Sequence, residues 1–171
     1  MKAAVAGFFL VIAATAYSQQ AGKQESPAEH HCSMMKHDEM MKHGDMAMGF
    51  SQSETTHHFQ LSATGGSIEV QTNDPSDTAS REQIRHHLRE IAKAFAEGDF
   101  SSPMLTHSRV PPGVPDMQRL KGALSYSYVE TDRGGKVLIV ADSTEVLEAV
   151  HEFLRFQIEE HQTKDSETVR K

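Results

Sequence analysis

A short stretch near the N-terminus has a high density of side chains that ligate soft metal ions. Eleven of the 19 residues at positions 30–48 are His, Met or Cys: His30, His31, Cys32, Met34, Met35, His37, Met40, Met41, His43, Met46 and Met48. Residues 34–39 are followed at once by a near copy at 40–45, so these ligands are patterned. Thioether sulfur suits monovalent copper and silver, and imidazole suits divalent copper. The segment is therefore predicted to bind copper, as Cu⁺ or Cu²⁺, or silver.

The composition of this segment predicts a tail without a core of its own. No Val, Leu, Ile or aromatic residue occurs in it before Phe50, so residues 19–54 are predicted to be disordered without metal. Met34 and His37 stand three apart and would share one face of a helix formed on binding. Ordering entropy would weaken such a site, which favours a buffer or relay over a buried structural site. The alternatives are a low-complexity spacer for the segment, and a free thiol for Cys32.

A second group of candidate ligands lies in the remainder of the chain. It consists of His57, Met104, His107, His151 and His161. His151 and His161 belong to one predicted helix, and about 15 Å of rise over ten residues prevents them from chelating one ion unaided. Either imidazole can meet His107 or His57 from another element, as a metal site or as a general base. The alternative for each is an ordinary half-exposed, hydrogen-bonded imidazole.

The elements that position these residues are predicted from hydrophobic periodicity. Strands at 56–63 and 67–72, with a turn at Gly65-Gly66, precede a helix whose capping box is Ser80 and Gln83 and which ends at Gly98. The same pattern returns with strands at 124–129 and 136–140 around a turn at 133–135, then a helix capped by Ser143. This indicates a degenerate internal duplication.

Two ββα units at residues 55–164 predict an α+β fold. Their four strands would form a mainly antiparallel sheet with both helices on one face, whereas the strand order is not determined by sequence. Residues 165–171 are predicted to be disordered. Residues 99–122 contain four prolines and are predicted to be a long loop. This loop either covers a pocket, with Met104, His107 and Met117, or is a stiff crossover whose Met104, Leu105 and Val110 cover the sheet.

Composition and the N-terminus predict an exported protein. The 171 residues carry a net charge of −7 and no long basic stripe, which argues against nucleic-acid binding. Lys2, an apolar run at 3–14 and small residues at Ala16 and Ser18 predict a signal peptide at 1–18, cleaved near Ala16 to Ser18. An uncleaved anchor is the alternative, but the run is short for a bilayer. The mature chain is thus expected in the periplasm or outside the cell, without a membrane anchor.

Three motifs carry a resemblance to known sequences. They are Thr-His-His-Phe at 56–59, Met-Leu-Thr-His at 104–107 leading to Val114-Pro115, and His-Glu-Phe-Leu-Arg-Phe-Gln-Ile-Glu-Glu-His-Gln-Thr at 151–163. With them the chain resembles a family of small exported bacterial proteins of uncharacterised function. Such proteins are sometimes labelled aspartate carbamoyltransferase automatically. We reject that activity because the Ser-Thr-Arg-Thr-Arg phosphate loop and the two-domain length are missing.

Two functional hypotheses follow. The segment at 30–48 is similar to the His/Met-rich segments of periplasmic copper- and silver-resistance proteins, which implies a non-catalytic metal-binding protein that partners another periplasmic metal-handling protein. The alternative is an exported enzyme or small-ligand binder with a His-containing site under residues 99–122. Common enzyme signatures, such as G-x-S-x-G, a P-loop, G-x-G-x-x-G and H-E-x-x-H, do not occur in the sequence.

Overall fold

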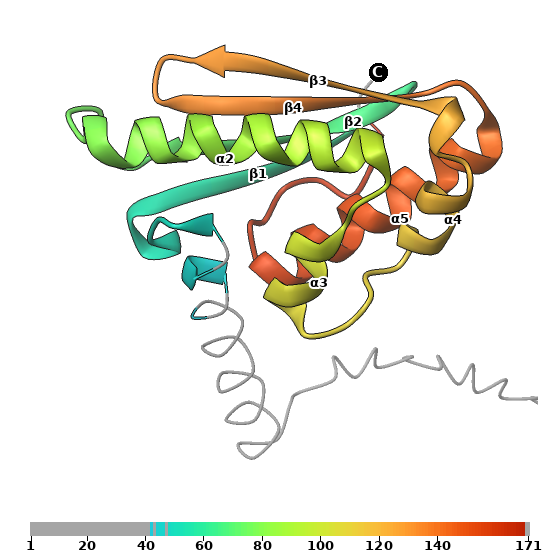
Figure 1. Cartoon of the computed structure of the whole chain (residues 1–171), viewed down its shortest axis with the longest axis horizontal. Coiled ribbons are helices and arrows are strands. Elements are labelled where there is room, and N and C mark those ends of the chain that lie inside the picture. The colour runs from blue at the N-terminus through green and yellow to red at the C-terminus, as the bar shows by residue number, and fades with distance from the viewer. Residues whose placement is uncertain (1–41, 43, 47, 170–171) are drawn as a thin grey trace, which may run out of the picture.

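The computed structural model describes residues 42, 44–46 and 48–169 and confirms the α+β fold. Its main elements are β1 (Thr55–Ser62), β2 (Gly65–Thr72), α2 (Thr78–Glu97), α3 (Ser101–His107), α4 (Val114–Arg119), β3 (Leu124–Thr131), β4 (Gly134–Ala141) and α5 (Thr144–His161). The strands form one antiparallel sheet, and α2 and α5 pack against the same face of it (Figure 1). Among the described helices, none is both long enough and apolar enough to cross a membrane.

The sheet has the strand order β1-β2-β4-β3, which the sequence did not determine. The two second strands, β2 and β4, are therefore neighbours at its centre. Their register relates the two units by a pseudo-twofold axis, since Gly66 lies opposite Ile139 and Gly135 lies opposite Val70. Each long helix packs on the hairpin of the other unit, α2 on β3 and β4, and α5 on β1 and β2. This arrangement agrees with an internal duplication.

The glycine pairs lie in the strands, and the predicted turns at these pairs are wrong by about two residues. β2 and β4 begin at Gly65 and Gly134, so the turns are formed by the two residues before each pair. Close packing explains the glycines. A Cβ atom on Gly66 would clash with the Leu154 side chain of α5 and with the carbonyl of Gln60 on β1. The glycine therefore allows helix α5 to approach the sheet closely.

The helix ends are partly as predicted. The N-cap of α2 is Asp77, whose carboxylate accepts a 2.9 Å hydrogen bond from the Ser80 backbone, so the predicted capping box at Ser80 is wrong. An Asp at this position also places a negative charge at the positive end of the helix. Gly98 ends α2 with a φ of 83° and Ser143 caps α5, both as predicted.

The folded unit extends beyond residues 55–164 at both ends. Phe50 is 5 % exposed in the core, Met48 packs against that core, and the Gln52 backbone donates a 2.7 Å hydrogen bond to Asp45. The predicted tail boundary at residue 54 is thus too late, because Phe50 anchors the preceding residues. At the other end, Asp165 accepts a 2.9 Å hydrogen bond from the Phe59 backbone. The candidate ligands at positions 30–41 and 43, and the predicted signal peptide, lie outside the described residues.

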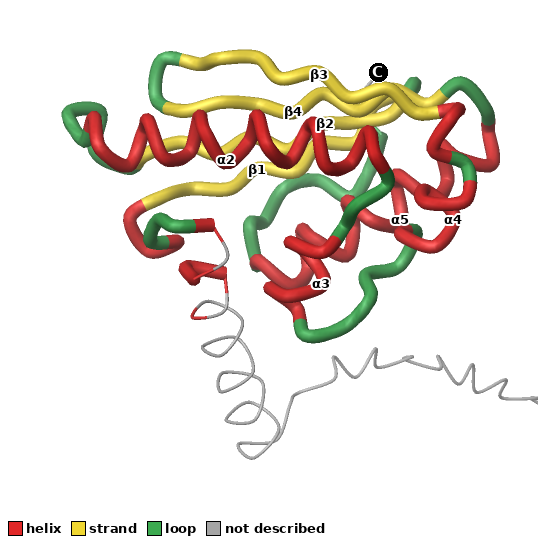
Figure 2. The backbone as a smooth tube through the Cα atoms, viewed as in Figure 1, coloured by secondary structure: helices red, strands yellow, loops and turns green. Residues whose placement is uncertain are grey.

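Residues 99–122 contain two helices where a loop was predicted (Figure 2). The side chains that pack on the core differ from those predicted for a stiff crossover. Val114 and Met117 of α4 are fully buried against the core, whereas Leu105 and Val110 are 65 % and 50 % exposed. Pro115 at the start of α4 suits a helix, since the first turn needs no N–H donor from it. This segment is therefore an ordered connection that brings α3 over the sheet.

Candidate functional site

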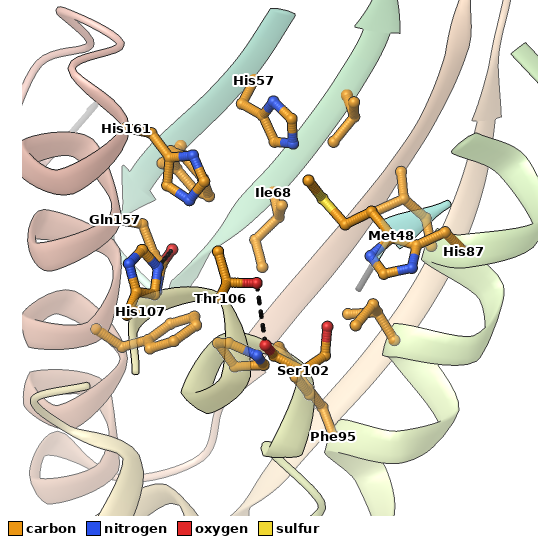
Figure 3. A pocket seen from close by; sticks show the side chains of 16 residues that line it. Met48, His57, Ile68, His87, Phe95, Ser102, Thr106, His107, Gln157 and His161 are labelled. Atoms are coloured by element: carbon orange, nitrogen blue, oxygen red, sulfur yellow. Dashed lines mark hydrogen bonds between the residues drawn. The ribbon is translucent and has the colours of Figure 1, made fainter. Parts of the chain in front are cut away.

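The candidate site is a cavity of about 60 Å³ on the helix-covered face of the sheet. Its floor is formed by β1 and β2, its walls by α2 and α5, and one end by α3, with Met48 on the side of the N-terminal segment (Figure 3). Most of the lining is apolar, with side chains such as Phe59, Ile68 and Phe153. Four imidazoles and one thioether interrupt this lining. Since about 10–15 Å³ is enough for one water molecule, the cavity has room for a bound ion or a small group of atoms.

Three imidazoles from three different elements form a row along one side of the cavity. The ring of His57 on β1 stacks on that of His161, the last residue of α5, with centroids 5.2 Å apart and planes 20° apart. The ring of His107 on α3 meets His161 edge-on, again with centroids 5.2 Å apart. Figure 3 shows all three side chains directed toward the cavity. The fold thus collects imidazoles that lie about fifty residues apart in sequence.

Met48 and His87 form the opposite side. Figure 3 shows the Met48 thioether reaching into the cavity between His57 and His87. Phe50 supports this side, because its ring stacks on His57 at 6.3 Å and meets His87 edge-on at 5.7 Å. The end of the His/Met segment is therefore a wall of the site.

His107 is held by a polar network at the α3–α5 contact. Its Nε2 lies 3.0 Å from Oε1 of Gln157, and its Nδ1 lies 3.8 Å from a carboxylate oxygen of Glu160. Glu160 also accepts a 2.7 Å hydrogen bond from Arg109, whose guanidinium lies over the Phe156 ring. Burial lowers the pKa of His107, against the opposing effects of Gln157 and Glu160. These contacts fix the ring orientation at the cavity wall.

The imidazoles nearest Met48 are neutral at pH 7. Burial, together with smaller effects of the nearby His87 and His58, lowers the pKa of His57 from 6.5 to about 4. Burial and the neighbouring His86 likewise lower the pKa of His87 to about 4. A neutral imidazole retains a nitrogen lone pair, which is the form that binds metal ions.

Three polar atoms of lining residues are unsatisfied. Nε2 of His57, Nδ1 of His107 and Nε2 of Gln157 are buried and have no hydrogen-bond partner among the described residues. Buried polar atoms are normally paired, and a group without a partner is costly. A bound species in the cavity would provide partners for such atoms.

The structure brings together three of the five residues predicted as a second site. His57, His107 and His161 line the cavity, whereas Met104 is half-buried on α3 outside the lining. His151 lies elsewhere, with its Nε2 3.0 Å from the Ser62 carbonyl and 3.1 Å from the Gly65 carbonyl. It tethers α5 to the β1–β2 turn, which is a structural role.

Met48, His87 and Gln157 also line the cavity, although none of them was predicted to belong to it. Met48 was predicted as a ligand of the tail, whereas His87 and Gln157 were not predicted as site residues. The stripe that His87 shares with Ile84 and Ile91 was the available signal for its inward direction. Nothing in the sequence indicated Gln157, because its role depends on where α3 meets α5.

The metal-binding chemistry of the described residues is restricted. Within residues 42–169 as described, no group of three or more His, Cys, Asp or Glu side chains is arranged to hold a metal ion. A preformed structural zinc site, with four such ligands, is thus not seen there. Comparison with known proteins finds no matching family model, no similar curated protein and no similar solved structure. The resemblance noted in the sequence stays a prediction.

Proposed function

We propose that this protein binds monovalent copper, or the chemically similar silver ion, outside the cytoplasm and has no catalytic activity. The supporting observation is that the His/Met segment ends in the wall of a cavity lined with imidazoles. Met48 is the last candidate ligand of that segment and packs against the domain core. A segment that captures ions is thereby joined to a folded domain with similar ligands.

The ligand chemistry supports a soft ion. Six of the eleven candidate ligands at positions 30–48 are thioethers, which bind monovalent copper well and zinc or hard cations poorly. Thioethers need no deprotonation and form no disulfides, so they remain usable in an oxidising or acidic compartment. The single Cys of the chain cannot form an internal disulfide. These properties agree with the predicted export, after cleavage near Ala16 to Ser18.

We infer that the function is buffering or transfer of the ion to another periplasmic metal-handling protein. Segments that order around an ion bind it more weakly than preformed sites, which favours release. The net charge of −7 attracts cations and disfavours nucleic acid as a partner.

The test is a competition titration of the mature chain against a chromophoric Cu⁺ chelator under reducing conditions. The variant replaces Met34, Met35, Met40 and Met41 by Leu, which keeps side-chain size and removes four thioethers. We expect the variant to lose at least one equivalent of chelator-resistant Cu⁺. An unchanged stoichiometry and affinity would overturn the proposal.

A second candidate function, binding of a small uncharged ligand, is favoured by the unsatisfied atoms and apolar walls of the cavity. In this case His107 and Gln157 would bind polar groups of the ligand. His107→Gln should then abolish binding in a screen of small amides and alcohols by ligand-observed NMR, with unchanged Cu⁺ stoichiometry. A screen without any hit that depends on His107 would remove this candidate.

A further inference from the structure

We propose that the cavity itself is a site for one Cu⁺ or Ag⁺ ion, bound by the thioether of Met48 and the imidazoles of His57 and His161. It would be separate from the sites within the His/Met segment. This inference deepens the proposed function and rests on it for the identity of the ion.

The separation of the two imidazoles agrees with one shared ion. In an imidazole, each nitrogen lies about 1.2 Å from the ring centroid and binds a metal ion at about 2.0–2.1 Å. Two imidazoles that bind one ion with a near-tetrahedral nitrogen–metal–nitrogen angle therefore have ring centroids about 5.2 Å apart. The His57 and His161 centroids are 5.2 Å apart. Their planes are nearly parallel, so one ring must turn for both nitrogens to face the ion. His161 is half-buried at the end of α5, and its ring also contacts those of Phe59 and His107.

The unsatisfied nitrogen of His57 points to a ligand. Its Nε2 is buried and has no hydrogen-bond partner among the described residues. A metal ion accepts the lone pair that no described donor uses, and the cost of burying the nitrogen is then offset.

The cavity favours a monovalent ion over a divalent one. Its lining is mostly apolar and the proposed ligands carry no charge, so the ion keeps its full charge after losing water. The electrostatic cost of that transfer rises with the square of the charge and is therefore about fourfold larger for a divalent ion. The thioether selects further for soft ions. The proposed site has only two His ligands and one Met. It is therefore consistent with the finding that no three His, Cys, Asp or Glu side chains among the described residues are arranged to hold a metal ion.

Met48 gives the site an entrance from the His/Met segment. Met46, two residues earlier, is 85 % exposed, whereas Met48 packs against the core. An ion held at Met46 thus needs to move only two residues along the chain to reach the partly buried thioether of Met48. We infer a relay that passes the ion from Met46 into the cavity.

The experiment uses the mature chain with Cys32 changed to Ser, with Met34, Met35, Met40 and Met41 changed to Leu, and with ¹⁵N-labelled His. Ag⁺ is added to one equivalent while the assigned imidazole ¹⁵N resonances are recorded. We expect a shift of one nitrogen each of His57 and His161. In competition titrations, Met48→Leu should weaken Ag⁺ binding at the shifting site at least tenfold, and His57→Gln should abolish it. Met-to-Leu exchange in cores is usually well tolerated, so Met48→Leu should remain folded.

The control is His86→Gln, at an exposed imidazole next to His87 on the solvent side of α2. It should leave the Ag⁺ affinity of the cavity unchanged. No shift at His57 with one equivalent of Ag⁺ would overturn the cavity site and leave the proposed function of the segment standing. The opposite outcome is a His57 shift with Ag⁺ while the four Met-to-Leu changes leave the Cu⁺ stoichiometry unaltered. That outcome would overturn the proposed role of the segment and keep the cavity site.

Discussion

Removal of the Phe50 ring tests whether the folded unit begins before β1. Phe50 is 5 % exposed and contacts the rings of His57 and His87, so Phe50→Ala removes almost all of a buried aromatic surface. A Phe side chain buries about 150–250 Å², equivalent to about 4–6 kcal/mol at about 25 cal/mol per Å². Because a compact unfolded state already buries part of this surface, we expect Phe50→Ala to lower the free energy of unfolding by about 3 kcal/mol.

The assay is urea unfolding of the metal-free mature chain. The control is Met46→Ala, because Met46 is 85 % exposed and should change the free energy of unfolding by less than about 0.5 kcal/mol. If the N-terminal segment merely detached in Phe50→Ala, its backbone amides would lose hydrogen-exchange protection while β1 kept it. If Phe50→Ala lowered the free energy of unfolding by less than about 1 kcal/mol and left amide hydrogen exchange unchanged, residues 48–54 would not belong to the folded unit.

Two further predictions concern the sheet and the buried imidazoles. Gly66→Ala should destabilise the protein by about 2 kcal/mol or more in urea unfolding, because its Cβ would clash with Leu154. Gly122→Ala, with no atom near the added Cβ, should be close to neutral, and equal effects would contradict the packing argument. For His57 and His87, the folded-state pKa of about 4 lies below 6.5, so the unfolded state takes up protons first as the pH falls. The metal-free protein should thus lose stability between pH 6.5 and 4, by up to about 3 kcal/mol per ring, and a flat profile in urea titrations would contradict this.

The fold was largely predictable because its signals are local. Alternating residues indicated the strands and the helical stripes indicated α2 and α5, since each pattern depends on near neighbours in sequence. The turns were misplaced because Gly65 and Gly134 serve interstrand contacts, which are not local. The short helices at 99–122 were missed for a similar reason. Val114 and Met117 become a core face only where α4 meets α5.

The site was predictable only in part. His57, His107 and His161 were candidates by residue type, but their meeting depends on a strand order that the sequence left open. His151 and His161 were equal candidates on one helix, and the structure separates them. His151 lies at the β1–β2 turn, whereas His161 lies at the far end of the helix, beside α3 and β1.

The most direct test of thioether-based copper binding is X-ray absorption at the copper K-edge. The sample is the Cu⁺-loaded mature chain with Cys32→Ser, which removes the only thiol and leaves every methionine. We expect monovalent copper with sulfur in its first coordination shell together with imidazole nitrogen. A shell of only nitrogen and oxygen, or a protein that retains no copper, would contradict the proposal.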